Sequence, residues 1–96
     1  RPLAVVTGAS SGIGRELARL FAERGYDLVV AAEDAGIHDA ATELQQLGVA
    51  VDAVQADLAT EDGVEQLAAR TAAGRPVDAL ALNAGVGLGG AFIEQD

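Results

Sequence analysis

Three glycines near the beginning of the chain lie where a strand is expected to turn into a helix. Gly8, Gly12 and Gly14 belong to the run Val-Thr-Gly-Ala-Ser-Ser-Gly-Ile-Gly at residues 6–14, with an apolar run before it and helical spacing after it. So tight a turn needs residues without a Cβ, and the free N–H groups of the first helical turn point toward an anion placed there. The segment predicts a diphosphate-binding loop; the alternative is a glycine-rich turn that only packs a helix on a strand.

The spacing Gly-x-x-x-Gly-x-Gly, preceded by Thr7, resembles the cofactor loop of the short-chain dehydrogenase/reductase family. Two later segments fall where that family also has motifs: Asp57-Leu58 and Asn83-Ala84-Gly85. The resemblance runs over essentially the whole chain but covers only the first half of the family's usual domain. It implies an NAD(P)-dependent oxidoreductase that interconverts a hydroxyl and a carbonyl group by hydride transfer.

The glycine loop supplies the first group of candidate cofactor residues. The N–H groups around Gly12, Ile13 and Gly14 should face the pyrophosphate, with Gly8 beginning the turn. The resemblance implies that Ser10 and Ser11 contact ribose or phosphate. The alternative for each serine is a turn residue whose hydroxyl satisfies its own backbone.

Two further segments are candidates through the resemblance. It implies that Asp57 accepts a hydrogen bond from the adenine amino group and that Leu58 adds a backbone contact beside it; taken alone, Asp57 would be a solvated loop carboxylate. Asn83, Ala84 and Gly85 would lie along the cofactor, with the asparagine side chain steadying the central strands. A leucine precedes them where many members carry a further asparagine. The glycines here could equally mark a loop without a partner.

The residues after the second expected strand decide between NAD and NADP. An acid there bonds the ribose 2′-hydroxyl, whereas an arginine accommodates the 2′-phosphate. The chain has Ala32, Glu33 and Asp34, with alanine where members that prefer NAD often place aspartate and acids where members that prefer NADP often place arginine. A 2′-phosphate would meet two carboxylates, so NAD is favoured.

The family's catalytic groups, a serine and a Tyr-x-x-x-Lys pair, are not expected here. The chain has one tyrosine, Tyr26, and no lysine, and its single histidine, His38, is expected on the surface. We expect the adenosine and pyrophosphate half of a longer enzyme that has been cleaved or is partly ordered. The alternative is a non-catalytic nucleotide-binding or dimerisation module that ends here by design.

The alternation of apolar runs and helical patterns predicts one α/β domain over residues 1–96, with a doubly wound, Rossmann-like parallel sheet in the order 3-2-1-4. Both glycine-rich loops then lie at the topological switch point. The fourth strand would be an unguarded apolar edge, which suggests a further strand. The expected strands are 3–7, 27–32, 49–55 and 77–82. The expected packing faces of the helices are Ile13, Leu17, Leu20 and Phe21; Ile37, Ala40, Ala41, Leu44 and Leu47; and Val64, Leu67, Ala68 and Thr71.

Charge and composition exclude several kinds of partner. The formal net charge is −9, which disfavours nucleic acid and anionic membranes. There is no cysteine for a disulfide or a thiolate metal site, no signal-peptide pattern and no apolar run long enough to cross a bilayer. We expect a cytoplasmic protein that binds no metal and assembles as a homo-oligomer. Its expected partners are a dinucleotide cofactor and a small alcohol or carbonyl substrate.

Overall fold

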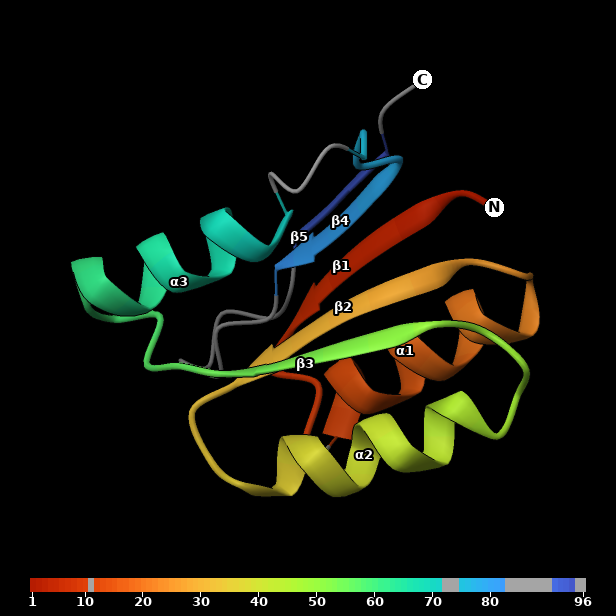
Figure 1. Ribbon diagram of the computed structural model, residues 1–96, viewed down its shortest axis with the longest axis horizontal. Coiled ribbons are helices and arrows are strands. Elements are labelled where there is room, and N and C mark those ends of the chain that lie inside the picture. The colour runs from red at the N-terminus through yellow and green to blue at the C-terminus, as the bar shows by residue number, and fades with distance from the viewer. Residues whose placement is uncertain (11, 72–74, 83–90, 95–96) are drawn as a thin grey trace.

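A single sheet in the order β3-β2-β1-β4-β5 organises the computed structural model (Figure 1), which describes residues 1–10, 12–71, 75–82 and 91–94. Strands β1 to β4 are parallel in the predicted order 3-2-1-4, and the α/β fold class is confirmed. The strands are β1 (Leu3–Thr7), β2 (Asp27–Ala32), β3 (Val51–Gln55), β4 (Ala79–Leu82) and β5 (Ala91–Glu94). The helices are α1 (Gly12–Glu23), α2 (Gly36–Gln45) and α3 (Glu61–Thr71).

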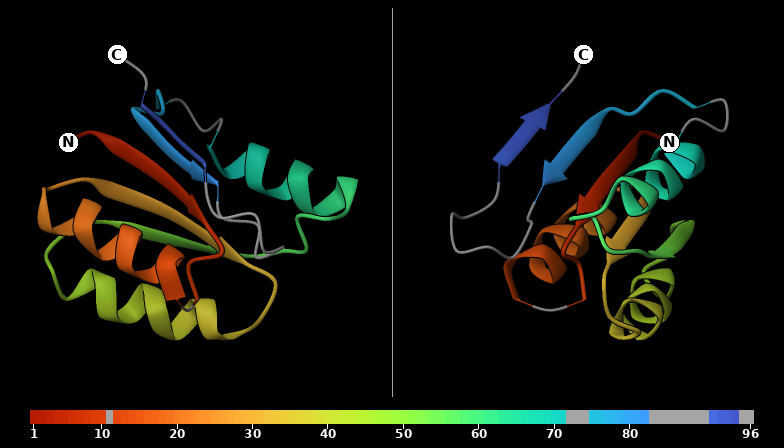
Figure 2. Two further views of the ribbon diagram at one scale, coloured as in Figure 1. Left: turned by 180° about the vertical axis from the view of Figure 1, so that it is seen from behind. Right: turned by 90° about the vertical axis from the view of Figure 1, so that its left-hand side faces the viewer.

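The sheet is covered unequally on its two faces. Helices α1 and α2 lie on one face and α3 lies on the other (Figures 1 and 2). Alternate residues of β1 and β2 serve the two cores: Val6 and Val30 belong to the cluster under α1 and α2, whereas Val5 and Val29 belong to the cluster under α3. Burial on both faces explains why these two strands are almost continuously apolar.

Helix α1 packs through smaller residues than predicted. Ile13 is 66% exposed and Leu20 is 45% exposed, so the predicted stripe is wrong at these two positions. The buried residues are Gly14, Ala18, Phe21 and Ala22. They define a face rotated by about one residue from the predicted one, because glycine and alanine let the helix axis approach the sheet closely.

A similar correction applies to α3. Val64 is 51% exposed and Ala68 is exposed, whereas Leu67 is half-buried against the core on this face. The one fully buried residue of the helix is Gly63. On α2 the predicted face is confirmed except at Leu47, which lies beyond the last turn and is 44% exposed.

Helix ends follow the sequence signals. Gly25 has φ +87° and Gly48 has φ +89°, so each adopts the left-handed conformation that ends the turn after α1 and after α2. Thr60 caps α3, since its hydroxyl accepts a hydrogen bond from the N–H of Gly63 at 3.1 Å. No helix among the described residues is long and apolar enough to cross a membrane.

The fourth strand is not an edge of this sheet. β5 pairs with β4 antiparallel, from Ala79 opposite Glu94 to Leu82 opposite Ala91 (Figure 2). The further strand that the apolar fourth strand suggested is thus present, and it belongs to this chain. A four-residue strand after a glycine-rich segment carries too short a pattern to be recognised from sequence.

Candidate cofactor-binding site

The carboxyl ends of the parallel strands bring three of the predicted segments to one edge of the sheet. Past β1, the N–H of Ala9 donates to the carbonyl of Ala31 at 3.1 Å; past β3, the N–H of Ala56 donates to the carbonyl of Ala32 at 2.9 Å. The glycine loop and the Asp57 turn are thus both tied to the end of β2. Ser11, Asn83, Ala84 and Gly85 lie outside the described residues.

The glycine loop has a backbone that only glycine adopts readily. Gly8 has φ +64° and Gly12 has φ +62°. An added Cβ at Gly12 would meet nothing within 4 Å, so glycine is needed there for conformation and the space in front of it is open. Ile13 and Gly14 follow in the first turn of α1, where backbone N–H groups have no acceptor within the helix.

Charge at the helix beginnings distinguishes α1 from its neighbours. Asp39 lies in the first turn of α2, and Glu61 and Asp62 lie in the first turn of α3. Among the described helices, α1 alone has no acidic residue there. The partial positive charge of its N-terminus is therefore not offset by a side chain of its own first turn, which suits an external anion.

Asp34 connects the glycine loop to the beginning of α2. Its Oδ2 accepts a hydrogen bond from the Ser10 hydroxyl at 3.2 Å, and its Oδ1 accepts one from the N–H of Gly36 at 3.1 Å. A Cβ at Gly36 would lie 3.1 Å from the same Oδ1, so the contact is close. The Ser10 hydroxyl is thus bonded across the site rather than to its own turn, and a carboxylate stands beside the loop.

Asp57 is held in a compact turn at the end of β3. Its Oδ1 accepts a hydrogen bond from the N–H of Ala59 at 2.9 Å, and its carbonyl accepts one from the Thr60 hydroxyl at 2.8 Å. Its Oδ2 makes no hydrogen bond to the residues described by the structure. Leu58 is half-buried against the core under α3. The turn therefore fixes one carboxylate oxygen and leaves the other for a donor.

The structure adds one residue that the sequence reasoning missed. A Cβ built on Gly63 would lie 1.9 Å from the carbonyl oxygen of Asp57. Only a glycine lets α3 approach this turn so closely. A glycine in the first turn of a predicted helix, where its propensity is poor, was the available signal.

The histidine and the tyrosine have structural contacts. His38 is exposed in the first turn of α2, with its Nε2 3.2 Å from Oε1 of Gln55 at the carboxyl end of β3. Tyr26 stands at the beginning of β2, its ring 5.0 Å edge-on from that of Phe21. No group of three metal-ligating side chains occurs among the described residues.

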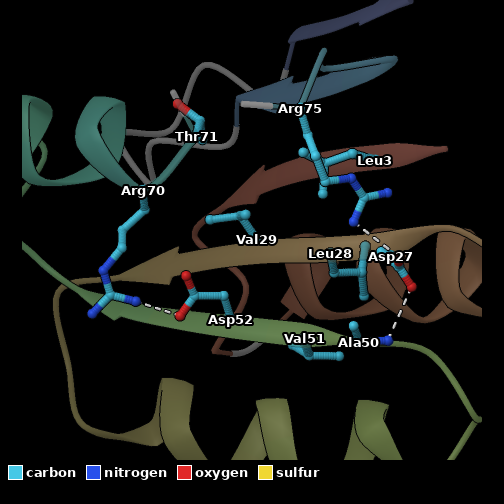
Figure 3. A pocket seen from close by; sticks show the side chains of 10 residues that line it. All are labelled: Leu3, Asp27, Leu28, Val29, Ala50, Val51, Asp52, Arg70, Thr71 and Arg75. Atoms are coloured by element: carbon cyan, nitrogen blue, oxygen red, sulfur yellow. Dashed lines mark hydrogen bonds and ion pairs between the residues drawn. The ribbon is translucent and has the colours of Figure 1, made fainter. Parts of the chain in front are cut away.

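A groove of about 200 Å³ lies at the opposite, amino-terminal end of the strands (Figure 3). Arg70 pairs with Asp52 and Arg75 pairs with Asp27, the latter at 3.0 Å. The N–H of Ala50, and then Arg75, lower the pKa of Asp27 by hydrogen bonding to its carboxylate. Each guanidinium in this groove is paired with a carboxylate. The two ion pairs connect α3 and the segment after it to the beginnings of β3 and β2, so neither arginine is an unpaired cation for a nucleotide.

Comparison with known proteins decides the family. The profile described as short chain dehydrogenase matches residues 2–96. The chain belongs to the short-chain dehydrogenase family. The loop at Gly8–Gly14 therefore belongs to the N-terminal part of an NAD(P)-dependent oxidoreductase domain.

Individual relatives agree with this assignment. The chain is 48% identical over 86 residues to 1-deoxy-11-beta-hydroxypentalenate dehydrogenase of Streptomyces arenae, covering 86% of this chain and 30% of that protein. It is 36% identical over 85 residues to the uncharacterized oxidoreductase YmfI of Bacillus subtilis, covering 85% and 34%. The chain thus spans about a third of the length of these curated relatives.

Solved structures of the family share the fold. L-sorbose reductase from Gluconobacter frateurii, complexed with NADPH and L-sorbose, matches with a TM-score of 0.82 and 38% identity, covering 90% of this chain and 34% of that one. The bulky-bulky ketone specific alcohol dehydrogenase from Comamonas testosteroni matches with a TM-score of 0.81 and 38% identity, covering 100% and 39%.

Proposed function

We propose that this chain provides the adenosine and pyrophosphate site of a short-chain oxidoreductase that interconverts a hydroxyl and a carbonyl group. The observation that carries the proposal is the beginning of α1, where Gly8 and Gly12 shape an open loop and no acidic side chain occupies the first turn. It lies at the switch point of the sheet, where ligands bind in open α/β folds.

The segments of the site have separate roles in this proposal. The N–H groups of Gly12, Ile13 and Gly14 bind the pyrophosphate, and Oδ2 of Asp57 accepts a hydrogen bond from the adenine amino group. Leu58 adds a backbone contact. Asn83, Ala84 and Gly85 line the cofactor further along. A bound nicotinamide cofactor would supply or accept the hydride.

The acids after β2 support a preference for NAD. Asp34 already accepts a hydrogen bond from Ser10, so its carboxylate stands beside the loop that would hold the phosphates. Together with the exposed Glu33 it would repel the 2′-phosphate of NADP and accept from a 2′-hydroxyl. Two solved relatives, L-sorbose reductase and a short-chain dehydrogenase from Sphingobium yanoikuyae, hold NADPH, so this preference would set the chain apart from them.

Further parts of the proposal concern the whole protein. The substrate would be a small alcohol or carbonyl compound, the assembly a homo-oligomer, and the catalytic tyrosine and lysine would come from outside these residues. The alternative dimerisation module relied on an open β4 edge, and β5 occupies that edge.

Charge at the helix N-terminus gives the test. Gly12→Asp and Gly12→Asn are matched in size, and both side chains tolerate positive φ in open space. The aspartate places a negative charge where the pyrophosphate would bind, so ADP-ribose affinity, measured by calorimetry, should fall about tenfold further than in the asparagine variant. Equal affinities in the two variants would place the anion elsewhere.

A further inference from the structure

The turn after β3 and the first turn of α3 form a closed set of contacts. The Asp57 carbonyl accepts hydrogen bonds from the N–H and the hydroxyl of Thr60, at 3.1 and 2.8 Å. The Thr60 hydroxyl in turn accepts from the N–H of Gly63 at 3.1 Å. The backbone of Gly63 is therefore linked to the backbone of Asp57 through one side chain.

Steric contact makes the same link from the other side. A Cβ at position 63 would lie 1.9 Å from the Asp57 carbonyl oxygen, 2.5 Å from its carbonyl carbon and 3.1 Å from its nitrogen. These are backbone atoms, which cannot rotate away as the end of a long side chain can. Any residue other than glycine must push α3 outward or displace the Asp57 peptide.

The carboxylate of Asp57 depends on the same turn. The N–H of Ala59, which holds Oδ1 at 2.9 Å, belongs to the two-residue link between Asp57 and Thr60. If the peptide of Asp57 or the cap at Thr60 shifts, this donor shifts too, and Oδ2 changes direction. The orientation of the oxygen available to a ligand is thus set by how closely α3 sits on the turn.

We infer that Gly63 is a positioning residue of the adenine subsite: its missing Cβ seats α3 on Asp57 and thereby aims the carboxylate at the purine amino group. The inference rests on the proposed function, because it needs a purine at Asp57. Gly63 itself touches no ligand.

ADP and IDP separate this role from general stability. They share the diphosphate and ribose and differ at the N1–C6 edge of the purine, where ADP carries an amino donor beside an unprotonated N1 and IDP a carbonyl acceptor beside an N1–H. A hydrogen bond from the amino group to a carboxylate should make ADP bind about tenfold more tightly than IDP to the unaltered protein. Calorimetric titration of both nucleotides measures this ratio.

Gly63→Ala should remove the preference for ADP and leave IDP affinity within about twofold of the original, because the pyrophosphate contacts at α1 are untouched. Alanine has the better helix propensity, so the loss would occur in spite of an intrinsically favoured helix. Gln66→Ala, an exposed change in the same helix, is the control and should leave both affinities unchanged.

Thr60 gives a second route if Gly63→Ala does not fold, as judged by circular dichroism. Thr60→Val removes the hydroxyl that joins Asp57 to Gly63 and should also reduce the ADP-to-IDP ratio, whereas Thr60→Ser keeps the hydroxyl and should restore it.

The outcomes are distinguishable. An ADP preference that persists in folded Gly63→Ala, or in Thr60→Val when the first variant is unfolded, overturns the positioning role and leaves the proposed function intact. Equal binding of ADP and IDP to the unaltered protein overturns the adenine contact and the positioning role with it. Failure of both nucleotides to bind overturns the proposed function as well.

Discussion

Replacing Asp34 by asparagine tests the cofactor preference with a change of one charge and almost no change of shape. The carboxylate accepts from Ser10 at 3.2 Å and from the N–H of Gly36 at 3.1 Å, and an amide oxygen can keep one of these bonds. The glycine loop should therefore retain its position. The main effect is electrostatic and falls on the 2′-phosphate of NADP.

The magnitude follows from Coulomb's law. Two unit charges about 4 Å apart interact by about 1 kcal/mol in water, so a phosphate of charge near −2 gains about 2 kcal/mol when the carboxylate is neutralised. That corresponds to about 30-fold in affinity. In the variant the 2′-hydroxyl of NAD would donate to a neutral amide oxygen instead of a carboxylate, so the affinity for NAD should fall by about fivefold at most.

Titration of the protein and of Asp34→Asn with NAD and NADP, at low ionic strength, measures the two changes. Asp39→Asn removes the same charge from an exposed position in the first turn of α2 and is the matched control. If Asp34→Asn leaves the NADP-to-NAD ratio unchanged, or if the control changes it equally, Asp34 does not face the ribose and the reasoning is refuted.

Three further predictions concern stability, each measured by denaturant unfolding. The pKa of Asp27 is lowered in the folded state by the N–H of Ala50 and by Arg75. Its contribution to the free energy of unfolding is therefore present above the unfolded pKa and is lost as pH falls through the folded pKa. Asp27→Asn should lower the free energy of unfolding by about 1 kcal/mol at neutral pH and should flatten the fall in stability below about pH 4. A decline that is unchanged in the variant would contradict this. Gly48→Ala should cost about 1 kcal/mol through its φ of +89° alone, since nothing lies within 4 Å of the added Cβ, and an unaffected midpoint would argue against a left-handed residue there. Ile37→Ala, at a fully buried position of α2, should lower the free energy of unfolding by about 2–5 kcal/mol. An equal loss in Leu47→Ala, where the side chain is 44% exposed, would contradict the buried face assigned to α2.

The backbone plan was predictable because local signals and burial agree. β1 and β2 have the expected bounds, because both faces of these strands are covered and their sequences are almost continuously apolar. Strand order followed from the alternation of elements and the handedness of crossovers. β3 and β4 each begin two residues later than expected, at Val51 and Ala79, because apolar residues outside a strand resemble those within it.

How closely the helices and loops approach the sheet and one another could not be predicted from the sequence. Hydrophobic size suggested Ile13 and Leu20 as the packing residues of α1, whereas closeness to the sheet favours Ala18 and Ala22. The same difficulty hides the site's internal contacts. The bond between Ser10 and Asp34 spans 24 residues and depends on the relative placement of two loops, which no periodicity encodes.

The attachment of α3 has a consequence for motion. Its one fully buried residue is a glycine, which contributes no apolar side chain, whereas α1 and α2 each bury several larger residues against the opposite face. Amide hydrogen exchange should therefore be fastest, among the three helices, in α3, through local opening that leaves β1 and β2 protected. The adenine end of a bound dinucleotide would then be held by the part of the molecule that opens most readily, and the pyrophosphate end by a part that opens late.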